Sequence, residues 1–141
     1  MTRTSVLLLT TLALVVVNGC GGSKGVNDPA NELPSGYVDT PADGAQVKMD
    51  ADVSGWALDD RGVARIRIYV DGRLAGVGAL TIDRKDVSKS FPRYANGTHK
   101  HGWTIPVGFD APGPHRVVAQ AVDTDGATRD IGVLNVTVSD R

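Results

Sequence analysis

The sequence from residue 55 to residue 72, which reads GWALDDRGVARIRIYVDG, decides the fold class. Its second half, Val63–Val70, alternates apolar and polar side chains, as a strand with one buried face does. We expect one set to face the core (Ala64, Ile66, Ile68, Val70) and the other to face outward (Arg65, Arg67, Tyr69). The dipeptide Asp71-Gly72 then favours a two-residue hairpin turn. The stretch predicts a strand, a tight turn and a returning strand.

Similar runs continue on both sides of this stretch. From Gly36 onward, short segments rich in Val and Ile are bounded by Gly, Pro, Asp and Asn. The expected strands besides Val63–Val70 are Gly36–Asp39, Gln46–Met49, Val53–Leu58, Leu74–Ile82, Trp103–Phe109, Val117–Val122 and Ile131–Val138, the first two lying at edges. No window holds a 3.6-residue apolar period long enough for a proper helix. About seven short antiparallel strands in a hundred residues predict an all-β sandwich.

Particular blocks of this region resemble a known family. Gly55–Ile66 running into Tyr69–Gly72, and the later Val117–Gly126, are similar to the core pattern of bacterial immunoglobulin-like (Big-type) domains. A segment found in one subgroup of that family matches the residues between them (Asp86, Val87, Phe91, Pro92, Tyr94, Asn96, Gly102, Trp103). The resemblance covers about Tyr37 to Ser139. It implies an immunoglobulin-like antiparallel β-sandwich over residues 36–141, serving as a spacer, adhesion module or appendage.

The N-terminal residues predict an export signal. Arg3 supplies a positive charge, and Val6–Val17 is an apolar run of signal-peptide length, too short for a stable membrane span. The residues ahead of Cys20 resemble the bacterial lipobox, which implies cleavage after residue 19 and diacylation, typically by palmitate, of the Cys20 thiol. The alternative is an ordinary secretory signal with an incidental cysteine. Lipidation explains why an exported chain has a single cysteine.

The domain organisation follows from these two features. Residues 1–19 are the expected signal peptide, residues 20–35 a lipidated cysteine and flexible linker rich in Gly, Ser, Asn and Pro, and residues 36–141 the folded domain. Gly21 after the cysteine implies delivery to the outer membrane if the cell is Gram-negative. We therefore expect a protein that is anchored to a membrane through its N-terminal lipid and resides in the cell envelope.

Composition argues against two classes of function. The chain has 15 Lys and Arg against 16 Asp and Glu, so no basic excess favours nucleic-acid binding. It lacks the Gly-x-Ser-x-Gly, His-Glu-x-x-His and Gly-Lys-Ser/Thr motifs, and no catalytic constellation is visible. We expect a non-catalytic module that needs no cofactor.

Acidic turns suggest one candidate metal site. In an immunoglobulin-like topology the loop with Asp59 and Asp60 lies at the same end as the loop with Asp123 and Asp125. Four converging carboxylates would suit Ca²⁺, which takes six to eight oxygen ligands. The alternative is that each aspartate caps its own turn, with Arg61 and Arg129 neutralising the charge that remains. His99, His101 and His115 are a weaker candidate for zinc, and ordinary solvated histidines are the alternative.

The stretch from Arg84 to Trp103 is the candidate binding loop. It places aromatic residues among cations, and the candidate binding residues are Phe91, Arg93, Tyr94 and Trp103. Such a loop can dock another envelope protein or stack on sugar rings. The alternative is that these aromatics cover an open edge of the sandwich. Trp56 carries the same ambiguity. The sequence thus favours protein interaction or an adhesive role, with carbohydrate binding as the second possibility.

Overall fold

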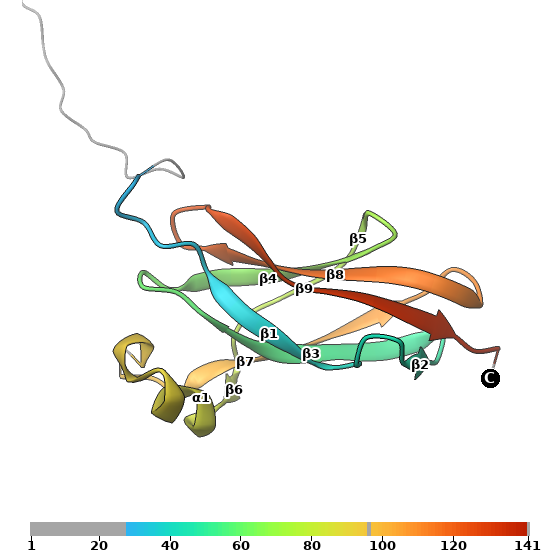
Figure 1. Cartoon of the computed structure of the whole chain (residues 1–141), viewed down its shortest axis with the longest axis horizontal. Coiled ribbons are helices and arrows are strands. Elements are labelled where there is room, and N and C mark those ends of the chain that lie inside the picture. Colours follow the sequence, from blue (N-terminus) through green and yellow to red (C-terminus); the bar gives the residue numbers. More distant parts are fainter. Residues whose placement is uncertain (1–27, 96, 141) are drawn as a thin grey trace, which may run out of the picture.

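A computed structural model describes residues 28–95 and 97–140, which form two facing antiparallel sheets (Figure 1). Sheet A has the order β1-β3-β7-β6, with bounds Ser35–Thr40, Asp50–Leu58, Lys100–Gly108 and Ile82–Asp83. Sheet B has the order β2-β9-β8-β4-β5, with bounds Gln46–Val47, Thr128–Val138, Gly113–Asp123, Val63–Val70 and Arg73–Gly78. The short β2 joins β9 in parallel. The expected β-sandwich is confirmed, and β1 and β2 lie at sheet edges as expected.

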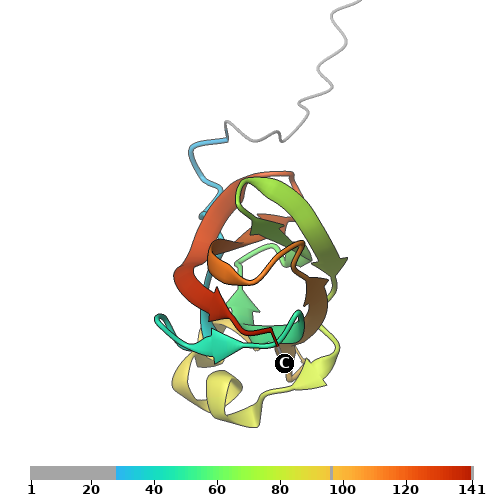
Figure 2. The same cartoon turned by 90° about the vertical axis from the view of Figure 1, so that its right-hand side faces the viewer.

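The core lies between the two sheets, which surround it when the molecule is seen along its long axis (Figure 2). Alternation along β3, β7 and β8 puts every second side chain into this core, because successive side chains of a strand point to opposite faces. Ile66, Ile68 and Trp103 are each 0% exposed. Burying each such side chain contributes about 1.5–3 kcal/mol of stability, and this apolar layer holds the sheets together.

One inward position of β4 was predicted wrongly. Ala64 is exposed, and Val63 packs against the core instead. The cause is a register shift between Val63 and Arg65 where β4 pairs with β8, because a bulge changes which face the preceding side chain occupies. The hairpin turn is confirmed: Asp71 and Gly72 have φ angles of 49° and 81°, the positive pair that a type I′ turn needs.

The expected strand Leu74–Ile82 is divided between the two sheets. Its first part is β5 of sheet B, and after a break at residues 79–81 the chain enters β6 of sheet A. Glycines permit the close approach that this crossing needs. A Cβ at Gly76 would lie 2.5 Å from Cγ2 of Ile105, and one at Gly78 would lie 2.7 Å from its Cγ1. The glycines that interrupt the run therefore mark the sheet change.

The long irregular stretch contains short helices that the sequence pattern did not predict. α1 spans Lys85–Ser90 and the 3₁₀ helix η1 spans Pro92–Tyr94. Only Val87 and Ser88 of α1 are buried, which is too little apolar periodicity to detect. Both helices lie outside the sandwich next to sheet A (Figure 2). Across the described ranges, no helix has the length and apolar character that a membrane crossing requires.

The residues before β1 contact the domain, although a flexible linker was expected through residue 35. We call Asp28–Pro34 the strap. Asn31 Nδ2 donates to Asp123 Oδ2 at 2.7 Å, Asp28 pairs with Arg61 at 3.0 Å, and Pro34 is fully buried. The folded unit therefore begins before residue 36. Cys20 and the expected signal peptide lie outside the described residues.

Candidate functional site

A row of large side chains crosses the outer face of sheet A. Tyr37 on β1 pairs with Trp56 on β3, Trp56 pairs with Gly102 on β7, and Gly102 pairs with Ile82 on β6. Tyr37 is 60% exposed, Ile82 is also exposed, and Trp56 is half-buried. Exposed aromatic residues aligned on a rigid sheet can contact a partner with little loss of side-chain entropy.

Phe91 joins this row from the helical segment. It lies at the C-terminal end of α1 and is 40% exposed. Its ring centroid is 5.5 Å from that of Trp56, with the planes inclined by 34°. The two rings are therefore tilted against each other, and part of each remains exposed. We call Tyr37, Trp56, Ile82 and Phe91 the outer patch.

Arg84 fixes the helical segment beside the outer patch. Its guanidinium contacts Asp39 of β1 at 2.6 Å and Asp86 of α1 at 2.8 Å. The side chain crosses over Gly102, where a Cβ would lie 2.9 Å from Arg84 Cγ. The hydrogen bonds from Arg84 hold the pKa of Asp86 at about 2. Ser88 Oγ and His99 Nδ1 lie 2.9 Å apart and tie α1 to the chain before β7.

The other candidate binding residues have structural partners. Trp103 is 0% exposed in the core, so its expected role in surface binding is wrong, because its position on β7 faces inward.

The Arg93 guanidinium lies 4.4 Å from the centroid of the Tyr94 ring. Arg93 also contacts Glu32 of the strap, and Tyr94 Oη donates to Glu32 at 2.9 Å. The hydrogen bond from Arg93 lowers the pKa of Glu32 most, and that from Tyr94 lowers it further. Arg93 and Tyr94 therefore fasten the strap, and of the four predicted residues Phe91 alone joins the outer patch.

The acidic turns meet at one end of the sandwich, as the topology argument predicted. Asp59 Oδ1 accepts the backbone N–H groups of Arg61 and Gly62, at 2.8 and 3.0 Å. Asp123 Oδ1 accepts those of Asp125 and Ala127, at 2.9 and 2.8 Å. Both aspartates act as turn caps.

Arg61 supplies the positive charge at this end of the molecule. It contacts Asp125 and Asp28 closely, and Asp60 at 3.8 Å. Within the described ranges no three His, Cys, Asp or Glu side chains are arranged to hold a metal ion. The geometry favours turn capping, and the calcium site of Asp59, Asp60, Asp123 and Asp125 stays a hypothesis.

His115 lies apart from His99 and His101, which are two residues from each other in the sequence. His101 is buried on β7, and His99 precedes that strand. His115 is on β8 beside the β4–β5 turn, where Nδ1 lies 2.6 Å from Asp71 Oδ2 and Nε2 lies 2.7 Å from the carbonyl of Ala111. These hydrogen bonds, with Asp71 the larger cause, raise the pKa of His115. The described histidines do not converge on one zinc ion.

The sequence pattern of Gly36–Asp39 indicates an edge strand and does not single out Tyr37 as a surface residue. Its partnership with Trp56 depends on strand order and register, which single-strand periodicity does not encode. The sequence does contain one indication. Side chains alternate along a strand, so Tyr37 should face outward if its apolar neighbour Val38 faces the core.

Comparison with known structures places this fold among immunoglobulin-like and fibronectin-type sandwiches. The fibronectin(III)-like modules of Clostridium thermocellum CbhA share 17% identity at a TM-score of 0.50, covering 76% of this chain and 47% of that one. The endo-β-1,4-mannanase of Thermotoga petrophila shares 12% identity at 0.52, covering 78% and 20%. Dimeric latent PorU from Porphyromonas gingivalis shares 17% at 0.51, covering 82% and 11%. This chain thus spans less than half of each, and the likeness shows the fold alone.

The family comparison agrees with the sequence resemblance. A family model described as the bacterial Ig domain matches residues 34–101, which include β1, β3, β4 and the helical segment. No curated protein matches the chain. Residues 34–101 thus match the family that the sequence pattern resembles.

Proposed function

We propose that this chain is an exported, lipid-anchored and non-catalytic module that binds a protein partner in the bacterial cell envelope through the outer patch. Bacterial Ig-like domains are typically extracellular or surface-exposed and non-catalytic, which supports the location and the absence of chemistry. The observation that carries the binding surface is the alignment of Tyr37 and Trp56 across adjacent strands, extended by Phe91. Aromatic residues are enriched among the energetic centres of protein interfaces.

The patch also has the rigidity that a binding surface needs. The inward neighbours of its residues, Val38 and Ala57, are buried in the core, so the backbone beneath the patch is fixed. Arg84 holds the helical segment to β1 through Asp39. Phe91 therefore projects from a restrained loop, and ordering it on binding costs little entropy.

The anchor rests on the sequence. Cys20 follows an apolar run of signal-peptide length, and its acylation would retain the domain at a membrane. If the cell is Gram-negative, Gly21 favours the outer membrane as the destination. The described strap then connects this anchor to the end of the sandwich opposite the C-terminal end (Figure 1).

Carbohydrate binding is the second candidate for the same surface. Exposed rings on a flat sheet face can stack on the apolar faces of sugars. Tyr37 and Phe91 are the members of the outer patch whose rings are most available for such stacking. A glycan ligand would be a polymer or oligosaccharide, because Tyr37, Trp56 and Ile82 lie on three different strands of the sheet.

The test is in-cell cross-linking followed by capture of the tagged full chain from solubilised envelope. We compare wild type with Tyr37→Ser and Phe91→Ser, using Leu74→Ser as the matched control. Leu74 is 56% exposed on β5 of the other sheet. One dominant protein that is lost with the first two variants and kept with the control supports the proposal. Recovery of polysaccharide with the same variant dependence supports the second candidate. Capture that is unchanged by Tyr37→Ser and Phe91→Ser contradicts binding through the outer patch.

A further inference from the structure

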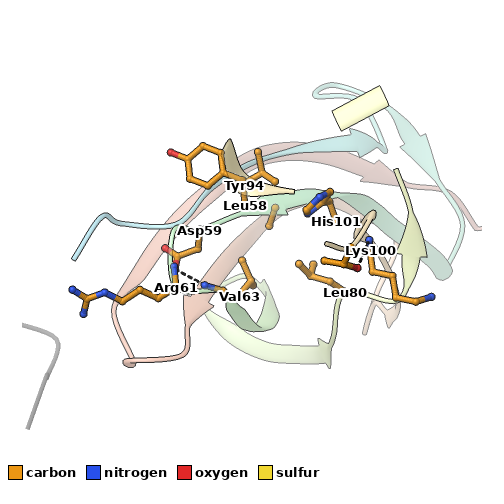
Figure 3. Close-up of a pocket in the computed structure, with 11 residues that line it drawn as sticks. Leu58, Asp59, Arg61, Val63, Leu80, Tyr94, Lys100 and His101 are labelled. Atoms are coloured by element: carbon orange, nitrogen blue, oxygen red, sulfur yellow. Dashed lines mark hydrogen bonds between the residues drawn. The ribbon is translucent and has the colours of Figure 1, made fainter. Parts of the chain in front are cut away.

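A pocket separate from the outer patch opens at the end of the sandwich that carries the acidic turns. It has a volume of about 430 Å³ and lies among the β3–β4 turn, the chain before β6 and the start of β7 (Figure 3). Leu58, Val63 and Leu80 supply apolar walls, while Asp59 and His101 supply polar groups. This volume falls in the range of small-molecule sites, which are mostly apolar with a few fixed polar groups.

Two polar atoms on the pocket-lining residues have no hydrogen-bond partner within the described part of the protein. They are Oδ2 of Asp59 and Nε2 of His101, on side chains that are 5% and 4% exposed. Buried polar groups in proteins nearly always have partners, and an unpartnered one is costly. Neither atom reaches the accessible surface, so binding requires a small rotation about each terminal torsion, which is broad for Asp and His.

Both atoms are acceptors. Burial lowers the pKa of His101, which favours the neutral imidazole. In the tautomer that carries its proton on Nδ1, Nε2 presents a lone pair and can accept a hydrogen bond. Asp59 already uses Oδ1 for the amides of Arg61 and Gly62, so Oδ2 is the oxygen left to accept a bond. A ligand of this pocket must therefore carry hydrogen-bond donors.

Charge around the pocket disfavours an anion. The Arg61 guanidinium is paired with Asp28 and Asp125 and extends away from the pocket (Figure 3). Lys100 extends away on the other side, where its Nζ donates to the carbonyl of Thr81 at 3.2 Å. Asp59, by contrast, is buried at the pocket wall, so an anionic ligand would lie against its carboxyl group.

We propose that this pocket binds a small polyol or amino polyol, a molecule with an apolar ring face and hydroxyl or ammonium donors. The apolar face lies against Leu58, Val63 and Leu80, and the donors meet Asp59 and His101. The site is independent of the outer patch, since none of its lining residues belongs to that patch.

Three pyranoses of nearly the same shape test the charge and donor requirements. Glucosamine, glucose and glucuronate are titrated at pH 7 into the isotope-labelled full chain, and shifts are followed by NMR at His101, Leu80 and Val63. We expect glucosamine to bind at least as tightly as glucose. Glucuronate should bind about tenfold more weakly than glucose, because its carboxylate would lie near the Asp59 carboxyl group. No localised shift with any of the three, or tightest binding by glucuronate, overturns the proposal.

Variants locate the contacts. Asp59→Asn keeps an Oδ1 acceptor for the turn amides but replaces Oδ2 by an amide donor, and His101→Phe removes the acceptor while keeping a ring. Each should weaken glucosamine binding by about tenfold. Leu80→Phe should also block binding by filling the pocket without touching a polar atom. Lys89→Gln, at an exposed cation of α1 that does not line the pocket, is the control that leaves affinity unchanged. Undiminished binding in the folded Asp59→Asn and Leu80→Phe proteins contradicts the proposal.

Discussion

Tyr37 of β1 lies directly opposite Trp56 of β3, and both side chains project from the outer face of sheet A. Their sequence neighbours Val38 and Ala57 point the other way and are buried. The core therefore fixes the aromatic pair on the surface, because a one-residue slip of either strand would reverse both faces.

The exposure of Tyr37 predicts that its role is binding rather than folding. Tyr37→Ser should lower the free energy of unfolding by no more than about 1 kcal/mol, the size of a cross-strand pair contribution. Urea denaturation measures this change. A loss of several kcal/mol, comparable to Ile68→Ala in the core, would assign Tyr37 a structural role instead.

The contact between β1 and β9 across the open side of the sandwich predicts a strong effect at Gly132. A Cβ there would lie 2.4 Å from Cγ2 of Val38, so Gly132→Ala should destabilise the domain by about 1–3 kcal/mol through overpacking. The double variant with Val38→Ala should be more stable than the sum of the two single changes predicts. Strict additivity in thermal unfolding would show that the two residues do not meet.

Arg61 neutralises the acidic end, and its removal should be costly. Arg61→Gln leaves Asp28 and Asp125 without this partner, and we expect a measurable fall in the unfolding midpoint at pH 7. Arg73→Gln is the control, because the Arg73–Asp110 pair is highly exposed and should contribute almost nothing. Equal effects of the two substitutions on the unfolding midpoint would be inconsistent with this role of Arg61.

His115 predicts a pH dependence of stability. Its pKa is raised above 6.5 by Asp71 and the Ala111 carbonyl, so the folded protein holds the proton to higher pH than the unfolded chain. The resulting stabilisation is fully present below about pH 6.5 and is lost as pH rises through the folded-state pKa. The midpoint of thermal unfolding should fall between pH 6 and pH 9, and His115→Gln should reduce that fall. An unchanged pH profile in the variant would exclude the histidine as the cause.

Cys20 predicts the location of the protein. Cys20→Ser should abolish incorporation of labelled palmitate and release the protein from the membrane fraction, because acyl chains supply the anchoring free energy. Fractionation of cells that express the two forms measures this directly. Membrane retention of the serine variant would favour an ordinary signal with an incidental cysteine.

Local patterns predicted most of the fold, and they failed where tertiary geometry intervenes. Alternation alone predicts that Ile66 and Ile68 lie in the core, as they do. It fails at Ala64, because the bulge beside Val63 turns the Ala64 side chain to the outer face. The crossing at Gly76 and Gly78 depends on how closely β5 approaches Ile105, a distance that no local pattern contains.

The candidate site was only partly predictable for the same reason. Phe91 was identified from its loop, whereas Trp103 occupies an inward position of β7 and is buried. Tyr37 enters the outer patch through its register with Trp56. The strap was unexpected because Asp28, Asn31 and Glu32 are individually ordinary linker residues whose partners lie far along the chain.

The most direct measurement places a photo-activatable phenylalanine analogue at position 37, with a second protein carrying it at position 74, and irradiates living cells. Both positions are exposed, but they lie on different sheets. Binding through the outer patch predicts one dominant protein adduct from position 37 and none from position 74. No adduct from position 37, or equal adducts from both positions, would contradict the proposed interaction surface.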